Sequence, residues 1–118
     1  MEQEIIDILN SSAEITGKVA NRIYHIHIDS ANVYPAIAFF VDVSVLGVCV
    51  GGSTFQGQLT VMVETRSMLD LVYLRKHIIE TFEANKRYRF LSATPDMEST
   101  SKKYYVELDF KITSIDVL

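Results

Sequence analysis

Strict alternation of apolar and polar residues over residues 103–113, KYYVELDFKIT, constrains this chain more than any other feature. Successive side chains of a β-strand point to opposite faces, so the pattern predicts a strand that buries one face. The inward residues are Tyr104, Val106, Leu108, Phe110 and Ile112, and the outward residues are Lys103, Tyr105, Glu107, Asp109 and Lys111. A strand with one polar face is typical of an antiparallel sheet that is covered on one side.

Four further segments are predicted to join this sheet. Residues 58–66 alternate in the same way, and residues 19–28 and 88–93 are shorter strand candidates. Pro35 cannot donate a backbone hydrogen bond, so it suits the position where a strand over Ala36–Val45 begins. The glycine-containing segment 46–57 is predicted to be a turn, and residues 94–101 a polar loop.

Two helices are predicted. Residues 2–14 carry an apolar stripe with acidic residues in the first turns, and Gly17 is a plausible end. Ser67 opens a longer helix that extends to about Asn85, with Asp70 completing an approximate capping box. The apolar residues of this helix recur at helical spacing: Leu71, Leu74, Ile78 and Phe82.

These elements define one α+β domain over residues 1–118, in the order α-β-β-β-α-β-β. The polar outer faces of the strands favour a two-layer sandwich, with a mostly antiparallel sheet and both helices packed on one face. No repeat, low-complexity tract or linker interrupts the domain.

Composition excludes several function classes. The net charge of −4 comes with scattered basic residues, which is unlike a domain that reads nucleic acid through a basic face. The densest basic stretch, residues 86–89, is predicted to lie favourably near a helix C-terminus. The single cysteine, Cys49, favours a cytosolic setting and a plain apolar role. The acidic N-terminus is unlike a secretion signal, and no apolar run reaches the ~20 residues of a membrane helix.

The only candidate metal site is the pair His25 and His27, which a strand places on the same face, with Asp29 two residues further on. Two imidazoles and a carboxylate are a known zinc donor set. The competing interpretation is that Tyr24, Ile26 and Ile28 occupy the opposite face, so the histidines lie on the solvent or subunit face of an ordinary strand. We favour this second interpretation and predict no metal.

No catalytic motif is found. The chain has no nucleophile elbow or Cys-x-x-Cys pair, and Gly51–Thr54 lacks the lysine of a phosphate-binding loop. Glu107 and Asp109 are predicted to keep the outer face of the sheet soluble. We therefore expect a non-enzymatic protein without a cofactor. Apolar residues among the glycines of 46–57 indicate either a folded-back hairpin tip or an arm that binds a partner.

The order and spacing of several short motifs resemble a known family. A short helix precedes Arg22-Ile23-Tyr24, and Tyr34-Pro35-Ala36-Ile37 opens the next strand. A glycine-containing segment, an alternating strand at 58–65, one helix and an aromatic strand at 104–110 follow. Across roughly residues 3–113, this arrangement resembles the small tail-completion, or tail terminator, proteins of long-tailed bacteriophages and prophages.

The resemblance implies a structural protein. Such proteins form a ring, typically of six copies, that caps the head-proximal end of the tail tube and helps to join head and tail. The implied partners are further copies of the chain, the major tail tube protein and head-tail connector proteins, and DNA passes through the lumen without sequence readout. The implied location is the bacterial host cytoplasm during assembly and then the virion, with no membrane contact.

Under this resemblance, the expected contacts with neighbouring subunits or the tube lie in 46–57 and 94–102. The candidate interface residues are Val48, Val50, Phe55 and Met97. The alternatives are a head-side neck or connector adaptor, a small metal-binding protein that uses His25 and His27, and a cytosolic ligand-binding module.

Overall fold

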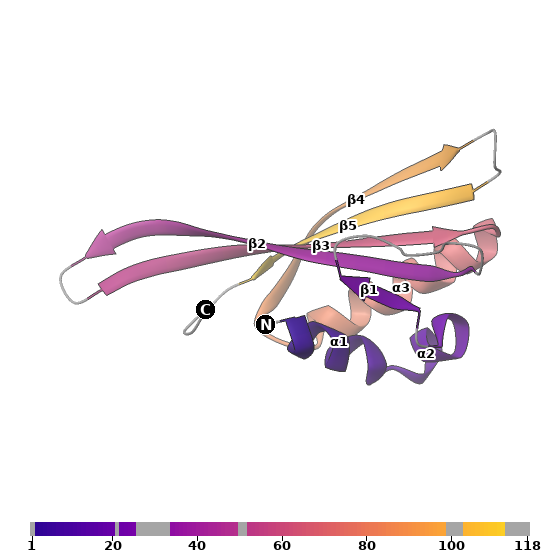
Figure 1. Cartoon of the computed structure of the whole chain (residues 1–118), viewed down its shortest axis with the longest axis horizontal. Coiled ribbons are helices and arrows are strands. Elements are labelled where there is room, and N and C mark those ends of the chain that lie inside the picture. Colours follow the sequence, from indigo (N-terminus) through magenta and orange to yellow (C-terminus); the bar gives the residue numbers. More distant parts are fainter. Residues whose placement is uncertain (1, 21, 26–33, 50–51, 99–102, 113–118) are drawn as a thin grey trace.

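One five-stranded sheet with three helices forms the protein in the computed structural model, which describes residues 2–20, 22–25, 34–49, 52–98 and 103–112. The elements are α1 (Glu2–Asn10), α2 (Ala13–Val19), β1 (Ile23–His25), β2 (Ala36–Cys49), β3 (Gly52–Thr65), α3 (Met68–Glu83), β4 (Tyr88–Glu98) and β5 (Lys103–Ile112). The strand order is β1-β2-β3-β5-β4, and only β1 and β2 pair in parallel. All three helices lie on one side of the sheet (Figure 1). The predicted α+β fold with a mostly antiparallel sheet is confirmed.

The core fills the space between the helices and the inner face of the sheet. Each element contributes its alternating or helical-period apolar residues, which are almost fully shielded from solvent. The largest of these side chains are Phe39, Phe82, Phe110, Ile5, Leu9, Ile15, Ile37, Leu59, Leu74, Ile78, Leu108 and Ile112. The predicted inward residues of 58–66 and 104–112 belong to this face, although Tyr104 is only partly buried. Burial of each such side chain contributes about 1.5–3 kcal/mol to stability. Since the alternation determines which face of each strand is buried, it also determines which side of the sheet packs against the helices.

The predicted helix over residues 2–14 is wrong in its extent, because two helices replace it. Ser12 is the N-cap of α2, and its hydroxyl accepts a hydrogen bond from the backbone nitrogen of Ile15 at 3.4 Å. An N-cap residue has an extended backbone, so the chain turns between α1 and α2. Gly17 lies inside α2 and does not end a helix. The predicted start of α3 is confirmed, since the Ser67 side chain accepts from the backbone nitrogen of Asp70.

The predicted strand over residues 19–28 begins later than expected, because Val19 closes α2 and β1 starts at Ile23. Residues 26–28 lie outside the described residues. Arg22 fixes this connection: its Nε donates to the carbonyl oxygen of Pro35, and its Nη2 donates to that of Lys18, both at 2.9 Å. The two short motifs Arg22-Ile23-Tyr24 and Tyr34-Pro35 therefore contact each other and place β1 beside β2.

Two segments predicted to be irregular are strand instead. Most of 46–57 belongs to the paired ends of β2 and β3, where Cys49 pairs with Gly52. Residues 94–98 continue β4, in which Pro95 pairs with Val106. Pro95 is tolerated because β4 is an edge strand of the sheet, where one side of the backbone needs no partner.

Candidate assembly surfaces

The β2–β3 hairpin extends beyond the rest of the sheet. The pairing of β3 with β5 begins at Gly57, whose partner on β2 is Val43. Within the described residues, Ser44–Cys49 and Gly52–Gln56 pair only with each other. We call these two segments the ribbon; it reaches away from the helices, as Figure 1 shows, and contributes to the 53 Å length of the molecule. Six residues of strand span roughly 20 Å.

The ribbon is uncharged, and among the described residues its outer strand edges have no backbone partner. No charged residue occurs between Asp42 and Glu64, and the register shifts by one residue at Leu46. Such a bulge increases the local twist of a hairpin. Natural proteins protect exposed strand edges with charges or proline, and an isolated two-stranded hairpin is only marginally stable in water. The ribbon therefore has the composition and backbone of a segment that a partner covers.

The structure places three of the four predicted interface residues. Val48 lies on β2 opposite Ser53, and Phe55 lies on β3 opposite Val45, so both are in the ribbon. Met97 lies on β4, about 54% exposed, with Tyr104 as its backbone partner. Val50 lies outside the described residues. Their role in assembly stays a prediction.

The face of the sheet opposite the helices carries an ordered polar cluster that sequence reasoning missed. Asp109 of β5 accepts hydrogen bonds from Thr60 at 2.9 Å and Gln58 at 3.3 Å on one oxygen, and from Ser92 at 3.2 Å on the other. These donors come from β3 and β4, so Asp109 ties three strands together. Alternation identifies Asp109 as outward-facing, but only the cross-strand register brings its three partners to it.

A shallow pocket adjoins this cluster on the same open face. Met62, Thr94, Tyr105 and Glu107 line it, with a cavity volume of about 230 Å³. Exposed apolar surface continues next to it, since Met62 and Phe40 are each 39% exposed. The pocket is thus partly apolar, with one carboxylate.

A separate apolar patch lies on the first turns of α3, where Met68, Leu69 and Val72 are 50%, 82% and 43% exposed. The neighbouring α2 is held against α3 by Lys18. The Lys18 Nζ lies 3.0 Å from an oxygen of Asp70 and 5.3 Å from the centre of the Tyr73 ring. The patch lies on a helix that is anchored by its buried residues, Leu71, Leu74, Ile78 and Phe82, and sequence periodicity alone marks only that inner face.

The candidate metal site is not supported by the described residues. His25 is exposed on β1, with its ring 5.3 Å from that of Phe39, and His27 and Asp29 lie outside the described ranges. In the part of the chain that the structure describes, His, Cys, Asp and Glu side chains form no group of three that could hold a metal ion. His77 lies on α3 beside Tyr73, with Glu80 at 4.0 Å.

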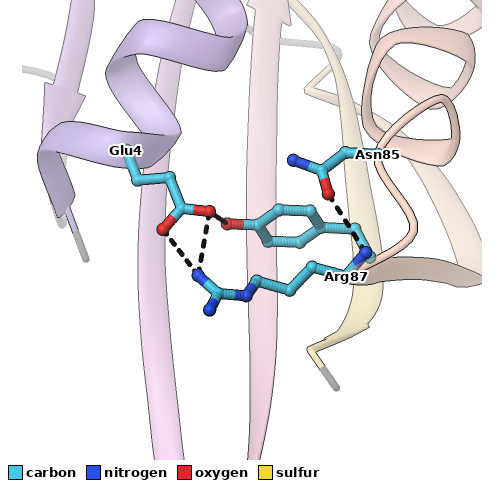
Figure 2. A network of polar contacts seen from close by, with 4 residues as sticks. Glu4, Asn85 and Arg87 are labelled. Atoms are coloured by element: carbon cyan, nitrogen blue, oxygen red, sulfur yellow. Dashed lines mark hydrogen bonds and ion pairs between the residues drawn. The ribbon is translucent and has the colours of Figure 1, made fainter. Parts of the chain in front are cut away.

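The basic stretch at 86–89 follows α3, which ends at Glu83, as predicted. Arg87 reaches α1, where its Nη1 lies 2.8 and 3.1 Å from the two oxygens of Glu4 (Figure 2). The Tyr88 hydroxyl donates to the same carboxylate at 3.1 Å, and the Asn85 side chain accepts from the backbone nitrogen of Arg87. This network fixes α1 to the turn between α3 and β4.

Replacing Tyr88 by phenylalanine is expected to lower the free energy of unfolding by about 1–2 kcal/mol at neutral pH, because Glu4 loses one hydrogen bond. Burial, followed by the nearby Glu4 charge, raises the pKa of Tyr88. A raised pKa means that the folded state holds this proton to higher pH than the unfolded state, so the contribution of Tyr88 is complete below about pH 10 and falls above it. Urea unfolding of the parent and Tyr88→Phe proteins from pH 7 upward tests both effects.

The difference in unfolding free energy between the parent and Tyr88→Phe proteins is expected to shrink as the pH rises above about 10. Tyr73→Phe is the matched control, since it removes the same atom from a half-buried tyrosine for which no hydroxyl hydrogen bond is found among the described residues. A constant difference at all pH values would contradict the role given to Tyr88.

Comparison with solved structures identifies the fold. A chain of the virion of a native gene transfer agent (GTA) particle has the same fold, with a TM-score of 0.75. The match covers 92% of this chain and 89% of that chain at 13% sequence identity. No protein-family model and no curated protein matches the sequence. Within the described residues, no helix has the length and apolar character required to cross a membrane.

Proposed function

We propose that this chain is a structural protein of a phage-like particle, and specifically a tail terminator that forms a ring on the head-proximal end of the tail tube. The observation that carries the proposal is an uncharged ribbon on a fold that also occurs in a gene-transfer-agent virion. The order of sequence motifs adds independent support, since it resembles the tail-completion family. The role is non-enzymatic: the surfaces described above suit protein contacts.

A ring requires two different surfaces that meet head to tail and close by rotation. The ribbon supplies one of them, and the exposed patch of Met68, Leu69 and Val72 on the body is the candidate for the other. The ring stops the addition of tube subunits and offers its opposite side to the head connector. The net charge of −4 suits a lumen through which DNA passes, because an acidic wall does not retain phosphates.

The mass of the purified protein in solution tests the ring. Light scattering after size-exclusion chromatography is expected to give about six times the 13.4 kDa of one chain. A mass of one chain at every concentration tested would contradict a ring that forms before the tail is present.

Electron microscopy of the protein mixed with isolated tail tubes distinguishes the terminator from a head-side adaptor. A terminator is expected to cap one end of each tube. Binding to heads without tails, and no binding to tubes, would favour the adaptor.

A further inference from the structure

The pocket on the open face of the sheet is built from three strands at one level. Glu107 of β5 is the register partner of both Met62 on β3 and Thr94 on β4, and Tyr105 lies two residues before it on the same face. Its side-chain walls are the Met62 thioether, the Tyr105 ring and the Thr94 hydroxyl. Because the positions are fixed by neighbouring strands, the walls are set by the sheet itself and do not depend on a loop.

Glu107 and Asp109 lie on the same face of β5 and differ in their partners. Asp109 accepts from Gln58, Thr60 and Ser92. Among the described residues, no hydrogen-bond donor or cation pairs with Glu107. The pocket thus presents a carboxylate beside apolar and aromatic surface.

A described cation on this face, Lys103 of β5, is engaged elsewhere. The Lys103 Nζ lies 5.4 Å from the centre of the Tyr34 ring and 6.0 Å from that of Tyr105, and Arg66 covers Tyr34 at 5.2 Å. A hydrogen bond with Tyr34 raises the pKa of Lys103, so this lysine stays charged at Tyr34. Glu107 therefore remains available to a cation from outside.

We propose that this pocket binds an arginine side chain of a different protein in the same particle. A guanidinium stacks on the face of an aromatic ring and forms paired hydrogen bonds with a carboxylate, and the pocket offers both groups. The remaining N–H groups of the guanidinium can donate to the Thr94 hydroxyl. The 230 Å³ volume is below the roughly 300 Å³ at which small-molecule pockets begin, and suits one long side chain. The carboxylate disfavours the phosphates of a nucleic acid.

Three of the five arginines of the chain are engaged within the molecule. Arg22, Arg66 and Arg87 are used within the molecule, on backbone carbonyls, on the Tyr34 ring and on Glu4. Of the other two, Arg75 is partly exposed on α3, on the helix side of the sheet, and a second copy could present it only by packing that side against this open face, a contact that the solution mass of Glu107→Gln reports. Arg89 lies on the same open face, exposed and opposite Lys111. For Arg89 of a second copy to fill the pocket, two open faces would have to pack together, which gives a twofold dimer and not a ring. This last step rests on the proposed function; the chemistry of the pocket does not.

Chemical shifts of the ¹⁵N-labelled protein test the pocket directly. The probe is Nα-acetyl-arginine methylamide, titrated to tens of millimolar. We expect saturable shifts centred on the amides of Met62, Thr94, Tyr105 and Glu107, with a Kd in the millimolar range. The citrulline analogue has the same shape without the charge and is expected to bind at least about tenfold more weakly than the arginine probe. The arginine probe is also expected to bind at least about tenfold more weakly to the Glu107→Gln variant than to the parent protein. Glu83→Gln, the same charge change on the exposed end of α3, is the matched control.

Three results of the titration would overturn the proposal. They are the absence of saturable shifts at these amides, equal binding by Glu107→Gln, and lysine methylamide binding as tightly as the arginine probe. A lower solution mass for Glu107→Gln would place a second copy in the pocket and overturn the assignment to a different protein. The titration detects the pocket whether or not the protein forms rings, so its failure and that of the proposed function are distinguishable.

Discussion

A variant in which Asn-Gly replaces residues 45–55 is expected to lose ring formation completely and to keep its fold. Ser44 and Gln56 are register partners, so a two-residue turn can close the hairpin between them. The rest of the sheet keeps all of its pairing, because β3 meets β5 only from Gly57 onward. The ribbon is a two-stranded extension, and we expect its removal to change the free energy of unfolding by only about 1 kcal/mol. Light scattering gives the mass, and urea unfolding gives the stability.

A point substitution tests the same surface without shortening the chain. Val48→Lys places a charge in the uncharged ribbon and is expected to weaken the ring, because the charge must be removed from water when the partner covers it. Asn10→Lys makes the same addition of charge at an exposed position of α1 and is expected to leave the mass unchanged. A ring of normal mass from the shortened variant would exclude the ribbon as an assembly arm.

The ribbon shows where sequence patterns predict the fold and where they do not. Alternation at 58–66 and 103–113 correctly identifies two central strands and the residues they bury. The glycines of 46–57 are typical of turns, yet most of that segment is strand. The length of a hairpin is set by how far two chains remain paired, which is a non-local property that turn residues do not report.

The N-terminal region shows a competition between two local signals. The apolar stripe of residues 2–14 predicts one helix. Serine, however, is more favourable as an N-cap than inside a helix, and Ser12 is the N-cap of α2. The cap prevails, and Val19 and Ile15 then reach the core from α2. A serine pair inside an amphipathic stripe is the available signal for such a break.

The periodicity of apolar residues cannot predict which side chains of distant segments contact each other. Glu4 and Arg87 are far apart in sequence, and neither residue lies in a motif. Asp109 is similarly typical of an exposed acidic residue until the register places Thr60 and Ser92 beside it. The sequence could identify which face of β5 is polar, but not which carboxylate on that face is satisfied and which remains available.

The second large effect is expected in the core, where Phe82→Ala should lower the free energy of unfolding by about 3–5 kcal/mol. Phe82 lies at the end of α3 with no exposed surface, and its ring centre is 5.1 Å from those of both Tyr88 and Phe110. The truncation leaves a cavity between α3, β4 and β5, because the backbone of a sheet cannot collapse to fill it. This loss is a large part of the 5–15 kcal/mol of a typical domain.

Urea unfolding measures this loss against Leu91→Ala, a control that shortens a side chain on β4 with 51% of its surface exposed. The control is expected to change stability by less than about 0.5 kcal/mol. Phe82 also packs against Tyr88, the residue that donates to Glu4, so Phe82→Ala and Tyr88→Phe should be non-additive when combined. A loss of unfolding free energy below about 1 kcal/mol for Phe82→Ala would contradict a role of this ring in the cooperative core. If the stability losses of Phe82→Ala and Tyr88→Phe simply add in the double variant, the aromatic cluster and the Glu4 network are energetically independent.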